Sequence, residues 1–262
     1  AVLVAAGIEA VSEGDFSSSN NATKLSFKTA ASEAAAEKMS LSSAGLLTVT
    51  GGVTMTGTTP TLTIGDAGAE DTKIVFDGNA QDFHIGLDDS TDDLVIGLGS
   101  TLGTTSHIVC DEAGRVTTPL QPSFSVAGLD ATLTFTAGYQ ALTTEWAAPQ
   151  HNIGTHFATS TGVFTAPVTG TYMFWVGAAI FDFTNEGNYS LKIETSGGTY
   201  QQYHSSAVRS DFDGDTYGNS RFSFTEHMDA NDTCYYRIYN VNTTGELGAS
   251  GTETQFGGVL IG

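Results

Sequence analysis

The residues best suited to chemistry lie in one short acidic segment, SDFDGDTYGN, at 210–219. Asp211, Asp213 and Asp215 occupy alternate positions there, and two glycines allow a tight turn. Several carboxylate oxygens held close together favour a hard cation, so these aspartates are candidate ligands and Ca²⁺ is the candidate cofactor. The EF-hand pattern is not met, because its sixth and twelfth positions hold threonine and phenylalanine. A solvated acidic loop without metal therefore remains the alternative.

A second set of candidate residues is suited to binding sugars rather than metal. Aromatic rings stack on sugar faces, while amide groups bind the hydroxyls. The chain has four such rings among Gly, Ser, Thr and Gln, and two nearby asparagines. The receptor-binding candidates are therefore Asn185, Asn188, Tyr200, Tyr203, His204 and Tyr217. Packing in the core or in a subunit interface is the alternative for each of them.

No enzyme motif accompanies these residues. The chain has no Gly-x-Ser-x-Gly elbow, no HExxH sequence and no P-loop. Its six histidines are scattered, and none is paired with another at metal-binding spacing. We therefore expect no catalytic residues and no enzymatic activity. A glycosidase with paired carboxylates stays open, because nothing in so acidic a chain selects one pair.

Charge narrows the range of partners. The 262 residues include 29 Asp and Glu against 9 Lys and Arg, a net charge of -20. Such a surface repels phosphate, which argues against nucleic acid and anionic membranes as partners. No window approaches the roughly 18 to 20 apolar residues of a membrane span, so we expect no membrane insertion. Cys110 and Cys234 have no CxxC spacing and are expected to be unpaired.

The rest of the chain indicates a mostly β protein with at most one short helix. Ala, Glu and Lys concentrate in 29–39, where the helix signal is strongest. Elsewhere Thr, Val, Ile and Phe are interrupted by Gly, Asp and Asn, which is typical of short strands and turns. KIVFDG, DFHIGLDD and DLVIGLGS, within 73–100, form a loose internal repeat.

Three regions follow from this pattern. Residues 1–24 are expected to be a leader or an anchoring segment, and 25–118 a β-rich shaft. The shaft segments are too thinly apolar to form a core alone, so we expect copies to pair as a trimer. An ordinary small β domain is the alternative. The prolines of RVTTPLQP (115–122) mark the boundary with a C-terminal domain at 119–262.

Aromatic residues in the C-terminal region recur at a specific spacing. The pattern comprises Trp146, Asn152, Phe157, Phe164, Gly170, Tyr172 and Phe174. It resembles the signature of the complement component 1q globular-head family, which shares its jelly-roll fold with tumour necrosis factor. PSFSV (122–126) and FGGVLIG (256–262) agree with this resemblance. Trp146 and Val176 depart from it, since the family usually has Phe and often another aromatic residue at those positions.

The spacing also has a physical interpretation that is independent of the family. Phe164, Tyr172 and Phe174 are separated by even numbers, so within extended strands they can share one face. We expect these rings to fill the space between two sheets. The resemblance implies a homotrimer, in which the apolar strands 172–181 and 256–261 meet across a threefold axis.

The N-terminal half indicates the biological context. KLSFKTAASEAAAEKMSLSSAGLLTVTGGVTMTG (24–57) resembles shaft sequences of bacteriophage fibres, and 71–100 is similar to repeats in structural proteins of marine phages. We therefore expect a homotrimeric fibre or spike on the virion surface, as a tail or head appendage. Its N-terminal segment would join other virion proteins, and its C-terminal jelly roll would bind a host surface glycan or protein.

Two other functions are compatible with the sequence. A secreted complement-like trimeric binding protein would suit the four Asn-x-Ser/Thr sequons, although the chain lacks a collagen Gly-X-Y stalk and a disulfide framework. A depolymerase acting on host polysaccharide is the third possibility. Released oligosaccharide after incubation with host capsule would identify that activity.

Overall fold

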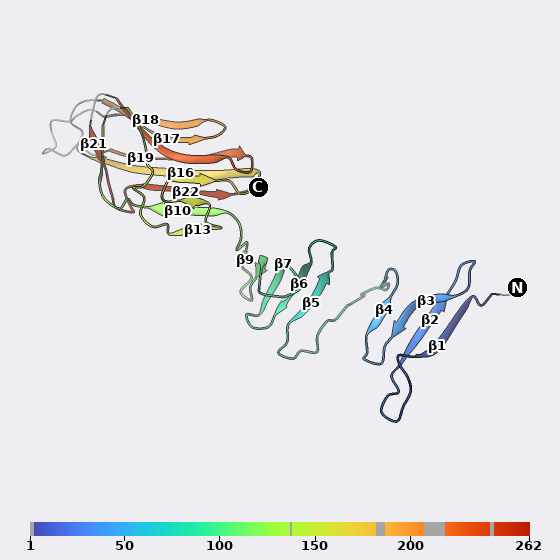
Figure 1. The fold of residues 1–262 in the computed structure, drawn as a ribbon. Helices are drawn as coiled ribbons and strands as arrows, with labels where there is room; N and C mark the ends of the chain where they lie inside the picture. The colour runs from blue at the N-terminus through green and yellow to red at the C-terminus, as the bar shows by residue number, and fades with distance from the viewer. Residues whose placement is uncertain (1–2, 137, 182–186, 207–217, 242–243) are drawn as a thin grey trace. The chain divides into compact units, whose positions relative to one another are not determined.

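The computed structural model describes residues 3–136, 138–181, 187–206, 218–241 and 244–262 (Figure 1). Within these ranges the chain forms strands and connections but no helix, so the mostly β fold expected from the sequence is confirmed. The chain divides into two compact units, Ala1–Ile64 and Gly65–Gly262. Cys110 and Cys234 are both free, as predicted.

The first unit is a single antiparallel sheet in the order β1-β2-β3-β4. Its strands are β1 (Ala6–Ser12), β2 (Thr23–Thr29), β3 (Ala36–Leu41) and β4 (Leu47–Val49). Directly paired residues share a face of a sheet. The register therefore aligns two apolar rows on one face, one of Ile8, Phe27, Met39 and Val49, and one of Ala10, Leu25, Leu41 and Leu47.

The opposite face of this sheet is polar and carries its ion pairs. Lys24 Nζ lies 2.8 Å from Glu37 Oε2, and the Ser26 hydroxyl donates a hydrogen bond of 2.6 Å to the same oxygen. Lys28 pairs with Glu9 on the neighbouring strand. The Ser26 side chain is fully buried in this network. The apolar face is uncovered by comparison, and Ile8 is 71% exposed.

The segment with the strongest helix signal does not form a helix. Of residues 29–39, Thr29 ends β2, residues 31–34 form bends, and β3 begins at Ala36. An isolated helix of this length is marginal in water, so its propensity is easily overridden. Pairing of Phe27 with Met39, and of Lys28 with Glu37 across a bulge, instead aligns both faces of the sheet.

The second unit begins with another one-layer sheet, in the order β5-β6-β7-β8-β9. Its strands are β5 (Thr72–Phe76), β6 (Phe83–Asp88), β7 (Asp93–Leu98), β8 (Ser106–Cys110) and β9 (Val116–Thr117). The loose repeat seen in the sequence corresponds to β5, β6 and β7. The register forms a row of four isoleucines on one face: Ile74, Ile85, Ile96 and Ile108.

Only the other face of this sheet is covered among the described residues. His84 and Val95 lie there, and both are nearly inaccessible. The loop after β7 contributes the buried Leu102 and the Gly99 carbonyl, which lies 2.8 Å from His84 Nδ1. The isoleucine face stays open, and Phe76 at its edge is 60% exposed.

The remainder of the second unit is a jelly-roll sandwich of two sheets (Figure 1). The seven-stranded sheet contains β10 (Ser123–Ala127), β11 (Leu133–Phe135), β13 (His151–Ile153), β16 (Gly170–Phe181), β19 (Gly218–Met228), β21 (Gly245–Leu247) and β22 (Gln255–Leu260). The six-stranded sheet contains β12 (Gly138–Ala141), β14 (Phe157–Ala158), β15 (Val163–Thr165), β17 (Gly187–Thr195), β18 (Thr199–Ser206) and β20 (Thr233–Val241).

Aromatic rings from both sheets fill the sandwich. Phe124 stacks on Phe157 and Phe164, with ring centroids 4.7 and 5.0 Å apart, and Phe164 contacts Phe174 edge-on at 5.7 Å. Phe164, Tyr172 and Phe174 are buried, which confirms the predicted core, and Trp146 and Phe157 are buried with them. Trp175 follows Phe174 on the same strand and therefore lies on the opposite face of the sheet.

Acid should weaken the first sheet through Glu37. Hydrogen bonds from Lys24 and Ser26 lower the pKa of Glu37 from its ordinary 4.5 to about 2. A depressed folded-state pKa contributes stability that is present above pH 4.5 and is lost as the pH falls toward 2. The unfolding temperature of wild type should therefore exceed that of Glu37→Gln at about pH 5, and the difference should shrink at about pH 2.5.

The exposed Glu112 supplies the control for this titration. Glu112→Gln should leave the unfolding temperature close to that of wild type at both pH values. A difference between wild type and Glu37→Gln that stays constant with pH would contradict the assigned ion-pair network.

Candidate functional site

Most of the predicted site residues lie outside the described part of the chain. Asp211, Asp213 and Asp215, together with Asn185 and Tyr217, fall in its gaps. The Ca²⁺ site therefore stays a prediction. Within the described ranges, no group of three or more His, Cys, Asp or Glu side chains could hold a metal ion.

Three other candidates are located by backbone register alone. Asn188 pairs with Ser205 between β17 and β18, Ser190 pairs with Tyr203, and Tyr189 pairs with His204. The side chains of Asn188, Tyr203 and His204 lie outside the described residues. Their receptor-binding role stays a prediction.

Tyr200 is the candidate whose side chain is described, and it packs against the sandwich. Its ring stacks on Phe224, with centroids 3.9 Å apart and planes 17° apart. Burial, followed by the nearby carboxylate of Glu226, raises the pKa of Tyr200 above its ordinary value. The ring continues the aromatic core at the edge of the domain, which is the packing alternative left open by the sequence.

The seven-stranded sheet presents an uncharged row to the outside. Backbone pairing aligns residues from β13, β10, β22, β16 and β19, in the order Ile153, Ser123, Val259, Met173 and Thr225. A second row contains His151, Ser125, Gly257, Trp175 and Ser223. Neither row contains a carboxylate, although the chain has 29. We call these ten residues the jelly-roll face.

Two glycines on β22 fit the rings on either side of the sheet. A Cβ atom at Gly257 would collide with the Trp175 indole, and one at Gly258 would collide with Phe174 and Phe124. The indole therefore lies flat over Gly257 on the jelly-roll face. Arg221 similarly lies across Gly177, and its guanidinium donates a 2.7 Å hydrogen bond to the Thr252 carbonyl. Gly257 and Gly177 therefore each make room for a larger side chain on the outer side of the sheet.

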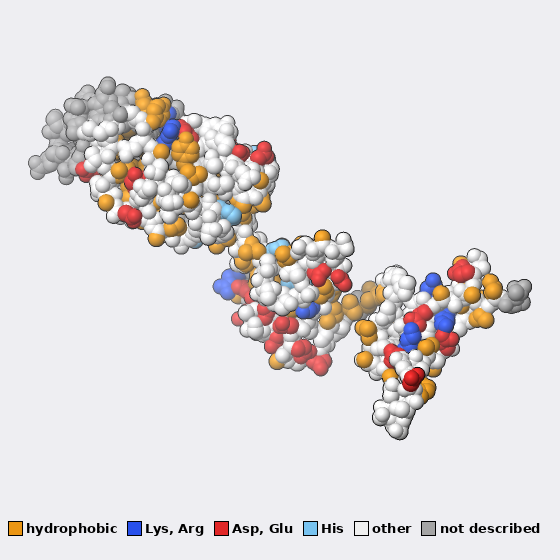
Figure 2. Space-filling model, in the orientation of Figure 1, with side chains coloured by type: hydrophobic (Ala, Val, Ile, Leu, Met, Phe, Trp, Pro, Cys, Tyr) orange, Lys and Arg blue, Asp and Glu red, His pale blue; other side chains and the backbone are white. Residues whose placement is uncertain are grey.

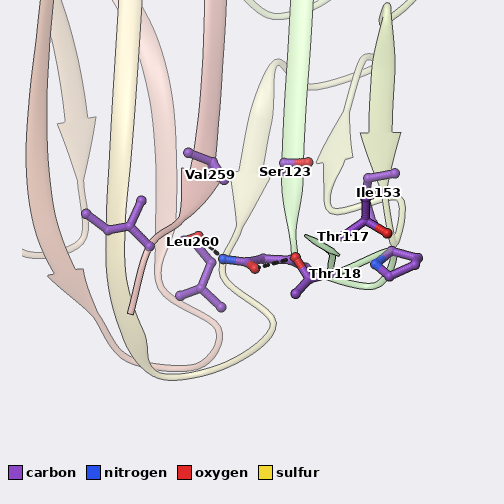
Figure 3. Close-up of a pocket in the computed structure, with 9 residues that line it drawn as sticks. Thr117, Thr118, Ser123, Ile153, Val259 and Leu260 are labelled. Atoms are coloured by element: carbon purple, nitrogen blue, oxygen red, sulfur yellow. Dashed lines mark hydrogen bonds between the residues drawn. The ribbon is translucent and has the colours of Figure 1, made fainter. Parts of the chain in front are cut away.

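A pocket of about 720 Å³ adjoins the jelly-roll face where β9 connects to β10 (Figure 3). Ser123, Ile153 and Val259 line it and also belong to the face. Gln121 connects the linker to the last strand: Thr118 Oγ1 donates to Gln121 Oε1 at 2.7 Å, and Gln121 Nε2 donates to the Leu260 carbonyl. These two hydrogen bonds hold the connection between β9 and β10 against the sandwich.

The two one-layer sheets present comparable apolar surfaces. We call the rows of Ile8 and Ala10 the β1–β4 face, and the isoleucine row with its neighbours the β5–β9 face. The neighbours are Leu87, Leu94, Cys110 and Val116 on one side and Phe76, Phe83 and Leu98 on the other. Neither face carries a charged residue in these rows. Figure 2 shows orange side chains over β1–β4 among red and blue ones, and several red side chains over β5–β9.

Sequence reasoning identified part of these surfaces. It named strands 172–181 and 256–261 as interface elements, but it did not name their neighbours Ile153, Ser123 and Thr225. Apolar and polar residues alternate in KMSLSS and KLSFK, but this alternation does not show which rows align. That alignment depends on strand register, which becomes visible only when the pairing is known.

Comparison with solved structures finds complement 1q and tumour necrosis factor domains. The globular domain of zebrafish complement 1qA protein is 18% identical, with 54% of this chain and 98% of that chain covered and a TM-score of 0.37. Eiger TNF from S. frugiperda is 12% identical over 54% and 93% of the chains, with a TM-score of 0.42. Murine APRIL is 15% identical over 54% and 99%, with a TM-score of 0.40.

Two sequence comparisons and a search for membrane helices complete these findings. No protein-family model matches the chain, and no curated protein matches it. Among the described residues, no helix is long and apolar enough to cross a membrane.

The stacking of Tyr200 makes a prediction that separates packing from ligand contact. Tyr200→Ala should lower the free energy of unfolding by about 1 to 3 kcal/mol, because a half-buried ring on Phe224 is lost. Tyr200→Phe keeps the ring and should change it by less than about 1 kcal/mol. Urea unfolding of both variants measures the difference. Equal stability of Tyr200→Ala and wild type would contradict the packing role.

Proposed function

We propose that this protein is a homotrimeric structural component of a phage virion, a fibre or spike whose C-terminal jelly roll binds the host cell surface. The observation that supports it most is the set of three uncharged faces: the β1–β4 face, the β5–β9 face and the jelly-roll face. None of these three faces has a layer of described residues over it. Contact with other copies of the chain would bury all three faces.

The energetics favour such burial. Covering a half-exposed Leu, Ile or Phe contributes roughly 1 kcal/mol, so the β1–β4 face with five such residues and the β5–β9 face with nine support stable contacts. Single-layer sheets need a packed face to be stable in water. Three copies carry a net charge of about -60, three times -20, and would repel one another elsewhere. Faces without carboxylates are where such acidic chains can approach.

The number of copies and the setting rest on sequence resemblance. The aromatic spacing of 146–174 resembles the complement 1q head family, which is trimeric. Residues 24–57 and 71–100 resemble phage fibre and virion proteins. The first segment includes most of β2 and all of β3 and β4, and the second includes β5, β6 and β7. In this setting three weak sites per trimer, repeated over a particle, would replace single-site affinity by avidity.

Assembly is tested by placing a charge in two of the three uncharged faces. Met173 in the jelly-roll face and Ile96 in the β5–β9 face are both 37% exposed. Light scattering should give wild type the mass of three 27.3 kDa chains. Met173→Asp and Ile96→Asp should each weaken the trimer, because burying three carboxylates near one axis is costly. The double variant should run as single chains.

Val168 supplies the matched control for this experiment. It is an exposed apolar residue before β16, outside the three faces, so Val168→Asp should leave the trimer intact. A monomeric wild-type chain at micromolar concentration, or trimers that survive both face substitutions, would overturn the proposed assembly.

The virion setting has a separate test. Antibodies raised against the purified protein should label appendages on purified phage particles in electron micrographs. The purified trimer, added to host cells before the phage, should reduce adsorption of the phage. Mass spectra that show N-glycans on native material would contradict the phage origin and favour a secreted protein.

A further inference from the structure

A cluster of tyrosines and cations lies on the six-stranded sheet, away from the jelly-roll face. Strand pairing aligns Tyr139 on β12 with Tyr239 on β20, and Arg237 on β20 with Lys192 on β17. The two tyrosine rings are 4.4 Å apart, between centroids. Lys192 Nζ lies 4.3 Å from the Tyr139 centroid and 5.2 Å from that of Tyr239.

Lys192 is a buried cation whose charge is offset from a distance, by the carboxylate of Glu194 two positions along β17. The residue is 6% exposed, yet no carboxylate lies within ion-pair distance among the described residues. Its recorded contacts are the Tyr139 hydroxyl, at 3.1 Å, and the two tyrosine rings. A buried ammonium normally has a carboxylate partner, because removing it from water is costly. This one can donate further hydrogen bonds.

The Arg237 guanidinium is a second cation, and it has hydrogen-bond donors left over. Its Nη1 donates a 2.6 Å hydrogen bond to Glu194 Oε1, while its Nε is buried without a hydrogen-bond partner among the described residues. The Arg237 side chain is 31% exposed, so a ligand can reach it. Tyr235 donates a hydrogen bond to the other Glu194 oxygen. Burial raises the pKa of Glu194, but these bonds outweigh it and lower the pKa.

The local charge is therefore opposite to that of the chain. Lys192 and Arg237 against the ionised Glu194 leave one net positive charge, on a chain with a net charge of -20. Beside these cations Tyr139 presents an open ring and is 57% exposed. An aromatic face next to cations that have donors left over matches a ring that carries a carboxylate.

We propose that this cluster binds an acidic sugar, a pyranose with a carboxylate such as a uronate unit of a surface polysaccharide. The sugar ring packs on Tyr139, and its carboxylate accepts hydrogen bonds from Arg237 and Lys192. The proposal rests on the proposed function for the source of the sugar, a host surface. The register also aligns Tyr203, a receptor-binding candidate from the sequence, with Ser190 in the row of Tyr139 and Tyr239.

The test measures binding of trigalacturonate to the full-length protein by isothermal titration calorimetry. Trigalactose, which lacks the carboxylates, serves as the neutral comparison. Salt at about 0.15 M or above shortens the Debye length to about 8 Å or less, so repulsion from the distant carboxylates is screened. We expect trigalacturonate to bind and trigalactose to bind at least about tenfold more weakly.

Two variants assign the binding to the cluster. Lys192→Met keeps the volume and removes the charge, and Tyr139→Leu removes the ring; each should weaken binding about tenfold. Lys73→Met, at an exposed lysine on β5, is the matched control and should bind as wild type does. Should Lys192→Met lower the unfolding temperature, Arg237→Lys replaces it, since it keeps the charge but loses the planar donor pair.

The outcomes separate this inference from the proposed function. Absence of trigalacturonate binding, equal binding of trigalactose, or unchanged binding by a folded Lys192→Met would overturn the acidic-sugar site. Adsorption of trimers to host cells tests the proposed function independently. If folded Lys192→Met trimers adsorb to host cells as well as wild-type trimers do, the virion role stands and the acidic-sugar site is contradicted. If wild-type trimers bind trigalacturonate but do not adsorb to host cells, the acidic-sugar site stands and the proposed virion role is contradicted.

Discussion

Burial of apolar sheet faces is the interaction on which this molecule depends. A sheet has two faces, and a stable domain covers at least one of them with another layer. The jelly roll meets this requirement within one chain, because Phe124 from one sheet stacks on Phe164 from the other. Among the described residues, the β1–β4 sheet has no such second layer, and the β5–β9 sheet has only the loop after β7 over one face. Their stability is tied to whatever covers Ile8 and Ile96.

Charge is distributed in a way that fits this requirement. In the first sheet the ions stay on one face, where Lys24 pairs with Glu37, and the other face is left to apolar residues. The jelly-roll face carries no carboxylate, and Arg221 beside it is tied to a carbonyl oxygen. Repulsion among acidic chains is long-ranged but screened by salt, whereas apolar contact is short-ranged and is not. On uncharged faces, the apolar contact can therefore outweigh the repulsion between acidic chains.

Periodicity in the sequence predicted the parts of the fold that depend on neighbouring residues. The even spacing of Phe164, Tyr172 and Phe174 placed them in the core, and the same alternation puts Trp175 outside it. The helix signal of 29–39 was misleading, because pairing of Phe27 with Met39 decides that segment. Contacts between residues far apart in the sequence could not be predicted from its periodicity. Lys192 and Tyr139 are 53 positions apart and meet only because β12 and β17 flank the same strand.

The position of β22 has a consequence for biosynthesis. This strand lies between β10 and β16 in the middle of the seven-stranded sheet, yet it ends only at Leu260. A ribosome must therefore complete the whole jelly roll before Val259 can join its row. The β1–β4 sheet is complete at Val49, with its apolar face exposed to neighbouring nascent chains on the same messenger RNA. In the proposed assembly, contact between copies can begin during translation, while the jelly-roll face becomes available only after β22 has been made.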